Sequence, residues 1–323
     1  MSQLVVQVLS LTSVQTDTKT SKMSNKSRLR YSISAQFLAP GRSYFDRFKL
    51  AAEAGFEGIE LNTVADPDEV QIVGEAAKAV GLTIHSVRTN TNWVHPLSGE
   101  DPQDVSIGVR ANLQALENAR CWGADTLLLI PGVVTSTVSP AQAYANSQRV
   151  IRNTILPAAE KLGIVIAVEN AWNGFLLTPT EYVRYIDEFK SPWVRAYLDV
   201  GNVTVGHPEH WIRIAGSRIV KLHVKDFHFD SRRGRFFFDK LGQGAIKWDA
   251  INEALAQIGF SGWATNTEPI GILARGGNFA ERKLRGRPLA RLPGVTPALW
   301  RIQRYFSRRW LRGAALRCDR FLG

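Results

Sequence analysis

Apolar and polar positions change their period repeatedly along the middle of the chain. Short apolar runs, such as IVIAVE at 164–169 and VKLHV at 220–224, are followed by longer segments in which apolar residues recur every three to four positions. Apolar runs of this length are typical of buried strands, and the longer spacing is typical of amphipathic helices. The pattern therefore predicts strands and helices in alternation between residues 31 and 268.

Eight strands and seven intervening helices are expected in this span. Gly55 and Gly81 follow predicted helix ends, Pro67 lies near a helix start, and Pro157 predicts a kink in the long helix 139–163. Continuous apolar strands that alternate with helices indicate a parallel sheet covered on both faces. The length fits a (β/α)8 barrel, the TIM barrel, of about 250 residues in a single domain. A doubly wound open sheet is the main alternative, but no G-x-G-x-x-G follows the first strand.

Four polar residues lie at the ends of four successive predicted strands. They are Glu169, Asp199, His223 and Glu268, and the spacings of 30, 24 and 45 residues correspond to about one strand and helix each, with a longer loop in the last. Each residue alone has an ordinary structural explanation, such as a capping aspartate or a core histidine. Because active sites of such barrels lie at the carboxyl ends of the strands, the four residues together predict one site.

Three carboxylates and one imidazole form a mostly oxygen ligand set, which suits hard divalent cations. We expect one divalent metal ion, with Mn²⁺ as the first choice and Mg²⁺, Co²⁺ or Zn²⁺ as alternatives.

The net charge of +11 is confined to the end of the chain. Residues 275–323 hold 13 Lys and Arg and 2 acids, so the preceding 274 residues hold 27 basic and 27 acidic residues. The charge therefore does not indicate that the predicted barrel binds nucleic acid.

The two ends of the chain break the alternating pattern. Residues 1–30 are predicted to be disordered, residues 31–270 to form the barrel, and residues 271–323 to form a basic segment with a final helix. Cys121 and Cys318 give no disulfide framework, and no apolar run approaches the roughly 20 residues of a membrane span. We expect a cytoplasmic protein that does not enter a membrane.

Several motifs follow one another in a recognisable order, namely AAEAGFEGIEL, NWVHPLSGEDP, GADTLLLIPG, VENAWNGFLLTP, YLDVGNV, HPEHWIRIAGSRIVKLHVKDF and LGQGAIKWDAI. From residue 31 to residue 269 the chain resembles the sugar phosphate isomerase/epimerase superfamily of xylose-isomerase-like barrels. Within it, the chain is most similar to hexulose-6-phosphate isomerases, L-ribulose-5-phosphate 3-epimerases and D-tagatose 3-epimerases. The resemblance implies a single divalent metal held by Glu169, Asp199, His223 and Glu268, with Glu169 and Glu268 as the acid/base pair.

These residues suit proton transfer on a ketose. The proton beside a carbonyl group is only weakly acidic, and a divalent cation that chelates the sugar oxygens would stabilise the ene-diolate. Two carboxylates on opposite faces would invert a carbon, whereas one base can serve a 1,2-isomerase. Epimerase and isomerase both stay open here, as do a free sugar and a sugar phosphate.

Further residues are candidates for substrate contacts. His85 ends the third predicted strand, Trp93 lies in the loop after it, and Asn202 follows the metal aspartate by three residues. Lys225 and Asp226 follow His223, and one of them is expected to support the ligands or contact the substrate.

The glycines of LGQG, Gly242 and Gly244, are a hint of a phosphate-binding loop.

Two other functions compete with this interpretation. An apurinic endonuclease of the endonuclease IV kind shares the barrel, but that family needs a histidine-rich trinuclear zinc site, and this chain has six histidines with Asn202 in place of one expected ligand. The second alternative is a barrel that binds sugars without catalysis. The expected partner is a small sugar or sugar phosphate rather than nucleic acid, and a homodimer or homotetramer stays open.

Overall fold

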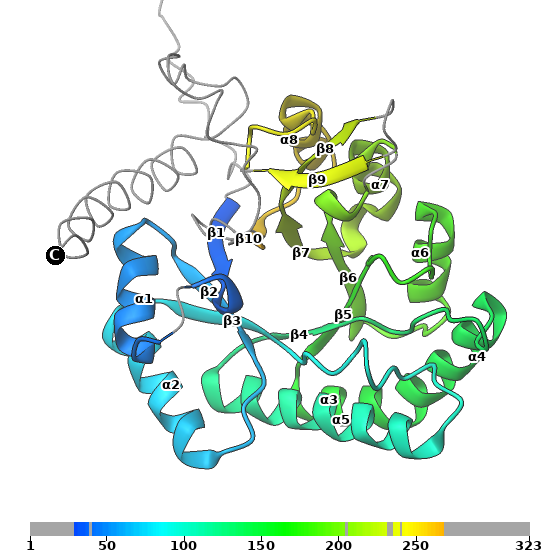
Figure 1. Cartoon of the computed structure of the whole chain (residues 1–323), viewed down its shortest axis with the longest axis horizontal. Coiled ribbons are helices and arrows are strands. Elements are labelled where there is room, and N and C mark those ends of the chain that lie inside the picture. The colour runs from blue at the N-terminus through cyan, green and yellow to red at the C-terminus, as the bar shows by residue number, and fades with distance from the viewer. Residues whose placement is uncertain (1–28, 39–40, 204–205, 231–234, 240, 268–323) are drawn as a thin grey trace, which may run out of the picture.

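Eight parallel strands close into a barrel that is ringed by helices (Figure 1). The computed structural model describes residues 29–38, 41–203, 206–230, 235–239 and 241–267. The strands follow one another around the barrel in the order β1-β10-β7-β6-β5-β4-β3-β2. The predicted (β/α)8 barrel is therefore confirmed.

The barrel strands are β1 (Leu29–Ser34), β2 (Gly58–Asn62), β3 (Thr83–Arg88), β4 (Thr126–Leu129), β5 (Val165–Glu169), β6 (Val194–Asp199), β7 (Ile219–Val224) and β10 (Gly262–Asn266). The helices are α1 (Tyr44–Glu53), α2 (Pro67–Ala79), α3 (Pro102–Trp122), α4 (Pro140–Val150), α5 (Leu156–Leu162), α6 (Pro179–Asp187), α7 (Pro208–Ala215) and α8 (Trp248–Gln257). Short 3-10 turns lie at Ala35–Phe37, Val200–Asn202 and Gly216–Arg218.

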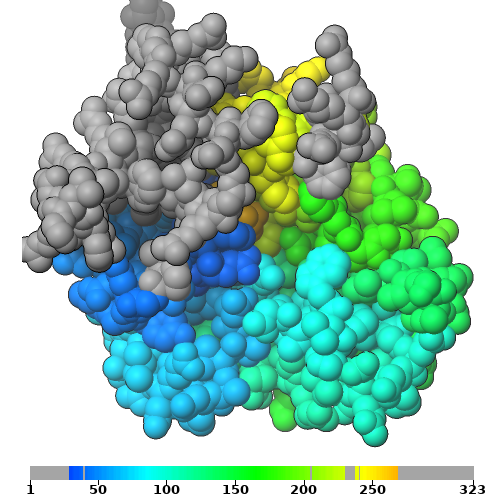
Figure 2. All heavy atoms as spheres, in the orientation of Figure 1, coloured from blue at the N-terminus to red at the C-terminus, as the bar shows by residue number. Residues whose placement is uncertain are grey.

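The barrel closes between its first and last strands. In the parallel ladder, Ser32 of β1 is the partner of Gly58 in β2 on one side and of Thr265 in β10 on the other. In the space-filling view the yellow late part of the chain accordingly lies between its blue beginning and its green middle (Figure 2). Strand β1 begins at Leu29, two residues before the predicted start of the domain.

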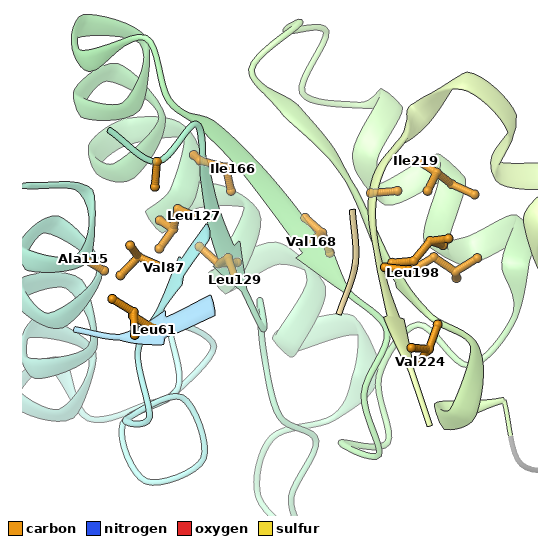
Figure 3. Packing of buried hydrophobic residues seen from close by; sticks show 14 of the residues in the cluster. Leu61, Val87, Ala115, Leu127, Leu129, Ile166, Val168, Leu198, Ile219 and Val224 are labelled. Atoms are coloured by element: carbon orange, nitrogen blue, oxygen red, sulfur yellow. The ribbon is translucent and has the colours of Figure 1, made fainter. Parts of the chain in front are cut away.

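Alternation along each strand separates two apolar clusters. Leu127, Leu129, Ile166 and Val168 belong to the large cluster between the sheet and the helices (Figure 3). The intervening Ala167 belongs to a small cluster that packs separately. Successive side chains of a strand point to opposite faces, so the residues in phase with Ala167 face the barrel interior.

The helix starts follow the local signals in the sequence. In α2, Asp66 caps the first turn by accepting a hydrogen bond from the Asp68 amide, and Pro67 occupies the first helical position. In α6, Thr178 and Glu181 form a capping box with reciprocal side-chain bonds.

The long helix predicted at 139–163 is interrupted. A π-helical turn at Ile151–Ile155 separates α4 from α5, and Pro157 lies in the first turn of α5. Proline has no amide hydrogen and cannot bond to the carbonyl four residues earlier, which accounts for the widened turn just before it. The predicted kink is thus an insertion of wider helical geometry.

An antiparallel hairpin follows β7 where only a long loop was expected. Strands β8 (Asp226–Asp230) and β9 (Arg235–Asp239) pair in a separate two-stranded sheet before α8. The hairpin grows directly from the carboxyl end of β7, so it lies at the same end of the barrel as the predicted site.

The predicted disordered segment and the predicted basic segment lie almost wholly outside the described residues, which begin at Leu29 and end at Thr267. Within those residues no helix is both long and apolar enough to cross a membrane.

Candidate metal centre

Three of the four predicted ligands come together at the carboxyl ends of adjacent strands. Glu169 ends β5, Asp199 ends β6, and His223 lies beside Asp199 in β7. One ligand atom from each lies within 4.8 Å of the others, and all three side chains are buried. Glu268, the fourth predicted ligand, lies outside the described residues.

His223 lies at the centre of this cluster. Its Nδ1 is 2.7 Å from Glu169 Oε1 and 3.9 Å from Asp199 Oδ2. Its Nε2 points the other way, to Glu60 Oε2 at 3.0 Å and Oε1 at 3.1 Å. The imidazole therefore bridges the two ligand carboxylates and a third carboxylate from the opposite side of the barrel.

Glu60 was not among the predicted site residues. It lies in β2 between Ile59 and Leu61, which pack outward in the large apolar cluster, so its own side chain points into the barrel. Ser86 and Tyr197 each donate a hydrogen bond of 2.8 Å to its Oε2. The position of Glu60 inside an apolar strand could have marked it as a candidate site residue. The local sequence does not predict which residue on another strand its side chain contacts.

The electrostatics of Glu60 and His223 are coupled. Burial alone would raise the pKa of Glu60, but the His223 imidazolium outweighs burial and holds this pKa well below its usual range. Burial alone would lower the pKa of His223, but the carboxylates of Glu60 and Glu169 raise it to about 10. Each group is thus held in its charged form by the other.

Asp199 is fixed by the backbone that follows it and by a lysine. Its Oδ1 accepts hydrogen bonds from the amides of Gly201 (2.9 Å) and Asn202 (3.2 Å). Its Oδ2 lies 2.7 Å from Lys225 Nζ. One oxygen is therefore occupied by the turn, and the other faces His223 and the lysine ammonium.

The charges of this cluster suit a divalent cation. Three carboxylates, those of Glu60, Glu169 and Asp199, form ion pairs with Lys225 and His223. With a neutral imidazole the cluster of these five groups holds two negative charges in excess, and one divalent ion in place of the Nδ1 proton balances them. The candidate ligand atoms of Glu169, Asp199 and His223 lie within 4.8 Å of one another, so these three residues would be able to hold one such ion together.

The structure places the other predicted site residues in different surroundings. Asn202 donates from Nδ2 to the Asn170 carbonyl at 2.7 Å, so it ties together the loops after β5 and β6. Trp93 is 47% exposed in the loop after β3. His85 was expected at the end of the third strand, but it lies inside β3, where the ladder to β2 shifts register. It is buried, its Nε2 lies 2.8 Å from Ser32 Oγ, and its ring stacks on Trp263 at 4.6 Å. Substrate contacts by these residues stay predictions.

Asp226 acts as an internal anion for the glycine loop. Its Oδ1 accepts from the amides of Phe227 (2.9 Å) and Ile246 (3.2 Å), and its Oδ2 accepts from the Gly242 amide and Trp248 Nε1, both at 2.9 Å. The predicted phosphate-binding loop is an anion cradle, but the anion it holds is a side chain of the same chain. Of the adjacent pair, Lys225 rather than Asp226 contacts a ligand carboxylate.

Comparison with known proteins agrees with this geometry. The family described as xylose isomerase-like TIM barrel matches residues 48–277. The chain is 21% identical over 240 residues to the L-ribulose-5-phosphate 3-epimerase UlaE of Escherichia coli O1:K1, a match that covers 70% of this chain and 82% of that protein. It is 25% identical over 247 residues to the D-psicose 3-epimerase of Enterocloster bolteae, covering 71% of this chain and 77% of that protein.

Among solved structures, an L-ribulose 3-epimerase superposes with a TM-score of 0.65 at 18% identity, covering 92% of this chain and all of that one. At this identity the likeness concerns the fold. The family match extends over most of the barrel and includes the strands that carry Glu169, Asp199 and His223. The chain belongs to the xylose isomerase-like TIM-barrel family.

Proposed function

We propose that this protein is a divalent-metal-dependent epimerase of a ketose or a ketose phosphate. The observation that carries the proposal is the convergence of Glu169, Asp199 and His223 at the carboxyl ends of three adjacent strands. Relatives that are named as 3-epimerases of ribulose 5-phosphate and psicose support an epimerase over a 1,2-isomerase. The choice between a free and a phosphorylated sugar is left to the experiment below, since the glycine loop already holds Asp226.

Glu169, Asp199 and His223 would hold the cation, with Glu268 as a further proposed ligand. When bound, a divalent ion would act as a Lewis acid and stabilise the negative charge that develops on the sugar oxygens. Burial of the three side chains excludes water from around the reacting atoms, and charges interact more strongly in such surroundings.

Glu169 is proposed to remove the proton from the sugar carbon beside the carbonyl. Glu169 is the last residue of β5. Its Oε1 lies 2.7 Å from His223 Nδ1. We propose Glu268 as the donor of the returning proton, because inversion at a carbon requires a donor on the side away from the base. Proton transfer by positioned groups of this kind contributes about 10²–10⁴-fold to the rate.

An aromatic wall beside the cluster fits a carbohydrate substrate. Lys225 Nζ, which pairs with Asp199, lies 5.2 Å from the ring centroid of Phe238 in the hairpin. The Phe238 ring stacks on Trp172 at 5.1 Å, and the two residues are 45% and 40% exposed. Trp172 also donates to the Asn202 carbonyl at 2.9 Å, which fixes the wall to the loop after the metal aspartate. Flat aromatic faces can pack on the apolar faces of sugars.

The alternative functions receive less support from the site. The group of candidate ligands within the described residues contains one histidine, whereas a trinuclear zinc nuclease requires several. A barrel that binds sugars without catalysis would not need Glu169 to keep an ionisable carboxylate among the ligands.

Exchange of a carbon-bound proton tests the proposal directly. The protein, loaded with Mn²⁺ or Mg²⁺, is incubated in D₂O with a panel of free and phosphorylated ketoses, and deuterium incorporation is followed by NMR. We expect incorporation at C3 of at least one ketose and slow appearance of its epimer. Incorporation at C1 alone would indicate a 1,2-isomerase, and no incorporation across the panel would contradict the proposal.

Replacement of Glu169 by glutamine, Glu169→Gln, removes the proposed base with almost no change of shape. We expect the exchange rate to fall by at least about 10²-fold, since the variant loses both the base and an anionic ligand. Glu117→Gln is the matched control, because Glu117 is half exposed on α3 and pairs with Arg120 at the surface. Full exchange activity in Glu169→Gln would rule out Glu169 as the base.

A further inference from the structure

Among the described residues, one of the buried carboxylates that the proposed reaction does not use belongs to a barrel strand. Glu60 is fully buried and comes from β2, across the barrel from the three ligand strands. It pairs with His223, whose Nε2 is 3.0 Å from Oε2 and 3.1 Å from Oε1. Burial of an unpaired carboxylate costs much free energy, and the ion pair with His223 offsets that cost for Glu60.

The position of Glu60 is fixed from two further strands. Ser86 in β3 and Tyr197 in β6 each donate to Oε2 at 2.8 Å, so this oxygen faces the imidazole and both hydroxyl groups. The ring of Tyr197 also packs against the imidazole, with centroids 4.4 Å apart. The carboxylate and the imidazole are therefore held in one relative orientation.

This orientation decides which nitrogen of His223 is free for a metal. Both nitrogens face a carboxylate, but Glu169 at Nδ1 is a proposed metal ligand, so a bound cation would replace the proton on that side. A neutral imidazole has one N–H donor and one acceptor nitrogen, so the remaining proton is on Nε2, where Glu60 accepts it. The lone pair is then on Nδ1, which faces Glu169 at 2.7 Å and Asp199 at 3.9 Å. Metal-binding histidines commonly donate their other N–H to a carboxylate or a carbonyl, and this bond increases the basicity of the ligand nitrogen.

We infer that Glu60 is a positioning residue for the metal centre: it holds the Nε2 proton of His223 so that Nδ1 binds the cation beside Glu169 and Asp199. The inference rests on the proposed metal dependence. Glu60 is not a ligand in this arrangement. Its carboxylate contacts His223 Nε2, Ser86 and Tyr197, and the imidazole ring lies between it and the carboxylates of Glu169 and Asp199.

Metal affinity of Glu60 variants tests the inference. Dissociation constants for Mn²⁺ are measured by calorimetry at one fixed pH for the wild-type protein, Glu60→Gln and Glu60→Ala. Loss of such a partner typically weakens metal binding about 10–100-fold, and we expect Glu60→Ala to lie at the upper end. Glu60→Gln keeps an acceptor for Nε2 but loses the charge, so a smaller loss is expected.

Ser32→Ala is the matched control. Ser32 is also buried in the barrel interior, and its hydrogen bonds there are to Thr265 at 2.7 Å and His85 at 2.8 Å rather than to Glu60 or His223. A general loosening of the interior would weaken metal binding in this variant as much as in Glu60→Gln. We expect its affinity to stay within about threefold of wild type, because the variant loses neutral hydrogen bonds to Thr265 and His85 but no bond to Glu60 or His223.

Nitrogen-15 NMR of the histidine-labelled wild-type protein with Zn²⁺ gives a second test that does not depend on a variant of Glu60. The His223 signals are assigned by their loss in His223→Asn. We expect a proton on Nε2 and the metal on Nδ1, and a metal on Nε2 would overturn the inference even if both Glu60 variants fail to fold. Unchanged Mn²⁺ affinity in both Glu60 variants would also overturn it and leave the proposed function intact, whereas a wild-type protein that binds no divalent ion would overturn both.

Discussion

Among single residues, His223 is central to the site, and its burial and its neighbours shift its pKa in opposite directions. Burial favours neutral imidazole, but Glu60 and Glu169 lie within 3.1 Å of its two nitrogens and outweigh it. Without a cation, His223 is therefore held as the imidazolium, with its pKa raised to about 10. A metal at Nδ1 takes the place of one of these protons.

This shift predicts how the stability of the metal-free protein depends on pH. Because the folded-state pKa of His223 is raised from 6.5 to about 10, its contribution is complete below about pH 6.5 and is lost as the pH rises toward 10. In the presence of a chelator we expect the melting temperature to fall between pH 6.5 and pH 10. The fall in melting temperature should be smaller in Glu60→Gln, which lacks one of the two carboxylates that raise the pKa of His223. An equal or larger fall in that variant would show that Glu60 does not raise this pKa.

Four of the five charged groups of this cluster were site candidates from the sequence, namely Glu169, Asp199, His223 and Lys225, whereas Glu60 was missed for a physical reason. Glu169, Asp199 and His223 stand at the ends of strands that are neighbours in chain order as well as in the sheet. Their convergence follows from the repeat of strand and helix alone. The contact between Glu60 and His223 joins residues 163 positions apart across the barrel, so no local pattern contains it.

At the scale of elements, two irregularities shape the region around the site. The ladder between β2 and β3 shifts register between Ile59 and Glu60, which places an extra residue, His85, in β3. Such a bulge lets His85 and Ser86 both bond to interior residues, although successive side chains of a regular strand point to opposite faces. The apolar pattern predicted this strand, but it could not reveal the extra residue within it.

The hairpin after β7 was missed because its sequence, with its charged middle SRRGR, reads as a loop. Asp226 at its start binds the segment that leads into α8, through the amides of Gly242 and Ile246 and the indole of Trp248. The hairpin and that segment therefore form one unit held by a single carboxylate.

Gly244 should be essential to this unit. A Cβ at this position would lie 2.0 Å from Asp226 Oδ1 and 2.6 Å from the Phe227 carbonyl oxygen, so the cradle must open in Gly244→Ala. We expect a loss of about 2–3 kcal/mol in the free energy of unfolding, measured with urea.

The control for this variant is Gly81→Ala. Gly81 follows α2 with φ of 73°, and a Cβ there would meet no atom within 4 Å, so only the left-handed backbone is penalised, by about 1–2 kcal/mol. A smaller loss in Gly244→Ala than in Gly81→Ala would show that Asp226 does not organise the loop.

At the scale of the whole molecule, the candidate metal centre is joined to the closure of the barrel. A chain of polar contacts of 2.7–3.1 Å runs through the interior and connects β7, β2, β6, β10, β1 and β3, in the order His223, Glu60, Tyr197, Thr265, Ser32 and His85. The barrel interior is thus partly polar, and this chain of contacts links the histidine to strands from both ends of the described chain.

Two truncations separate the strand that closes the barrel from the segment that precedes it. Deletion of residues 1–28 keeps β1 whole, and that segment shows no core pattern, so we expect unchanged Mn²⁺ affinity and an unchanged melting temperature. Deletion of residues 1–34 removes the strand that pairs with both β2 and β10, together with the fully buried Ile33 and with Ser32 of the polar chain.

The longer deletion leaves the edges of β2 and β10 unpaired, and exposed sheet edges favour aggregation. We expect it to abolish both cooperative unfolding, followed by circular dichroism, and Mn²⁺ binding, followed by calorimetry. Metal binding that survives in the longer deletion would show that the ligand strands hold the site without a closed barrel. Loss of metal in the shorter deletion would instead assign residues 1–28 a part in the site, which the pattern of the sequence does not predict.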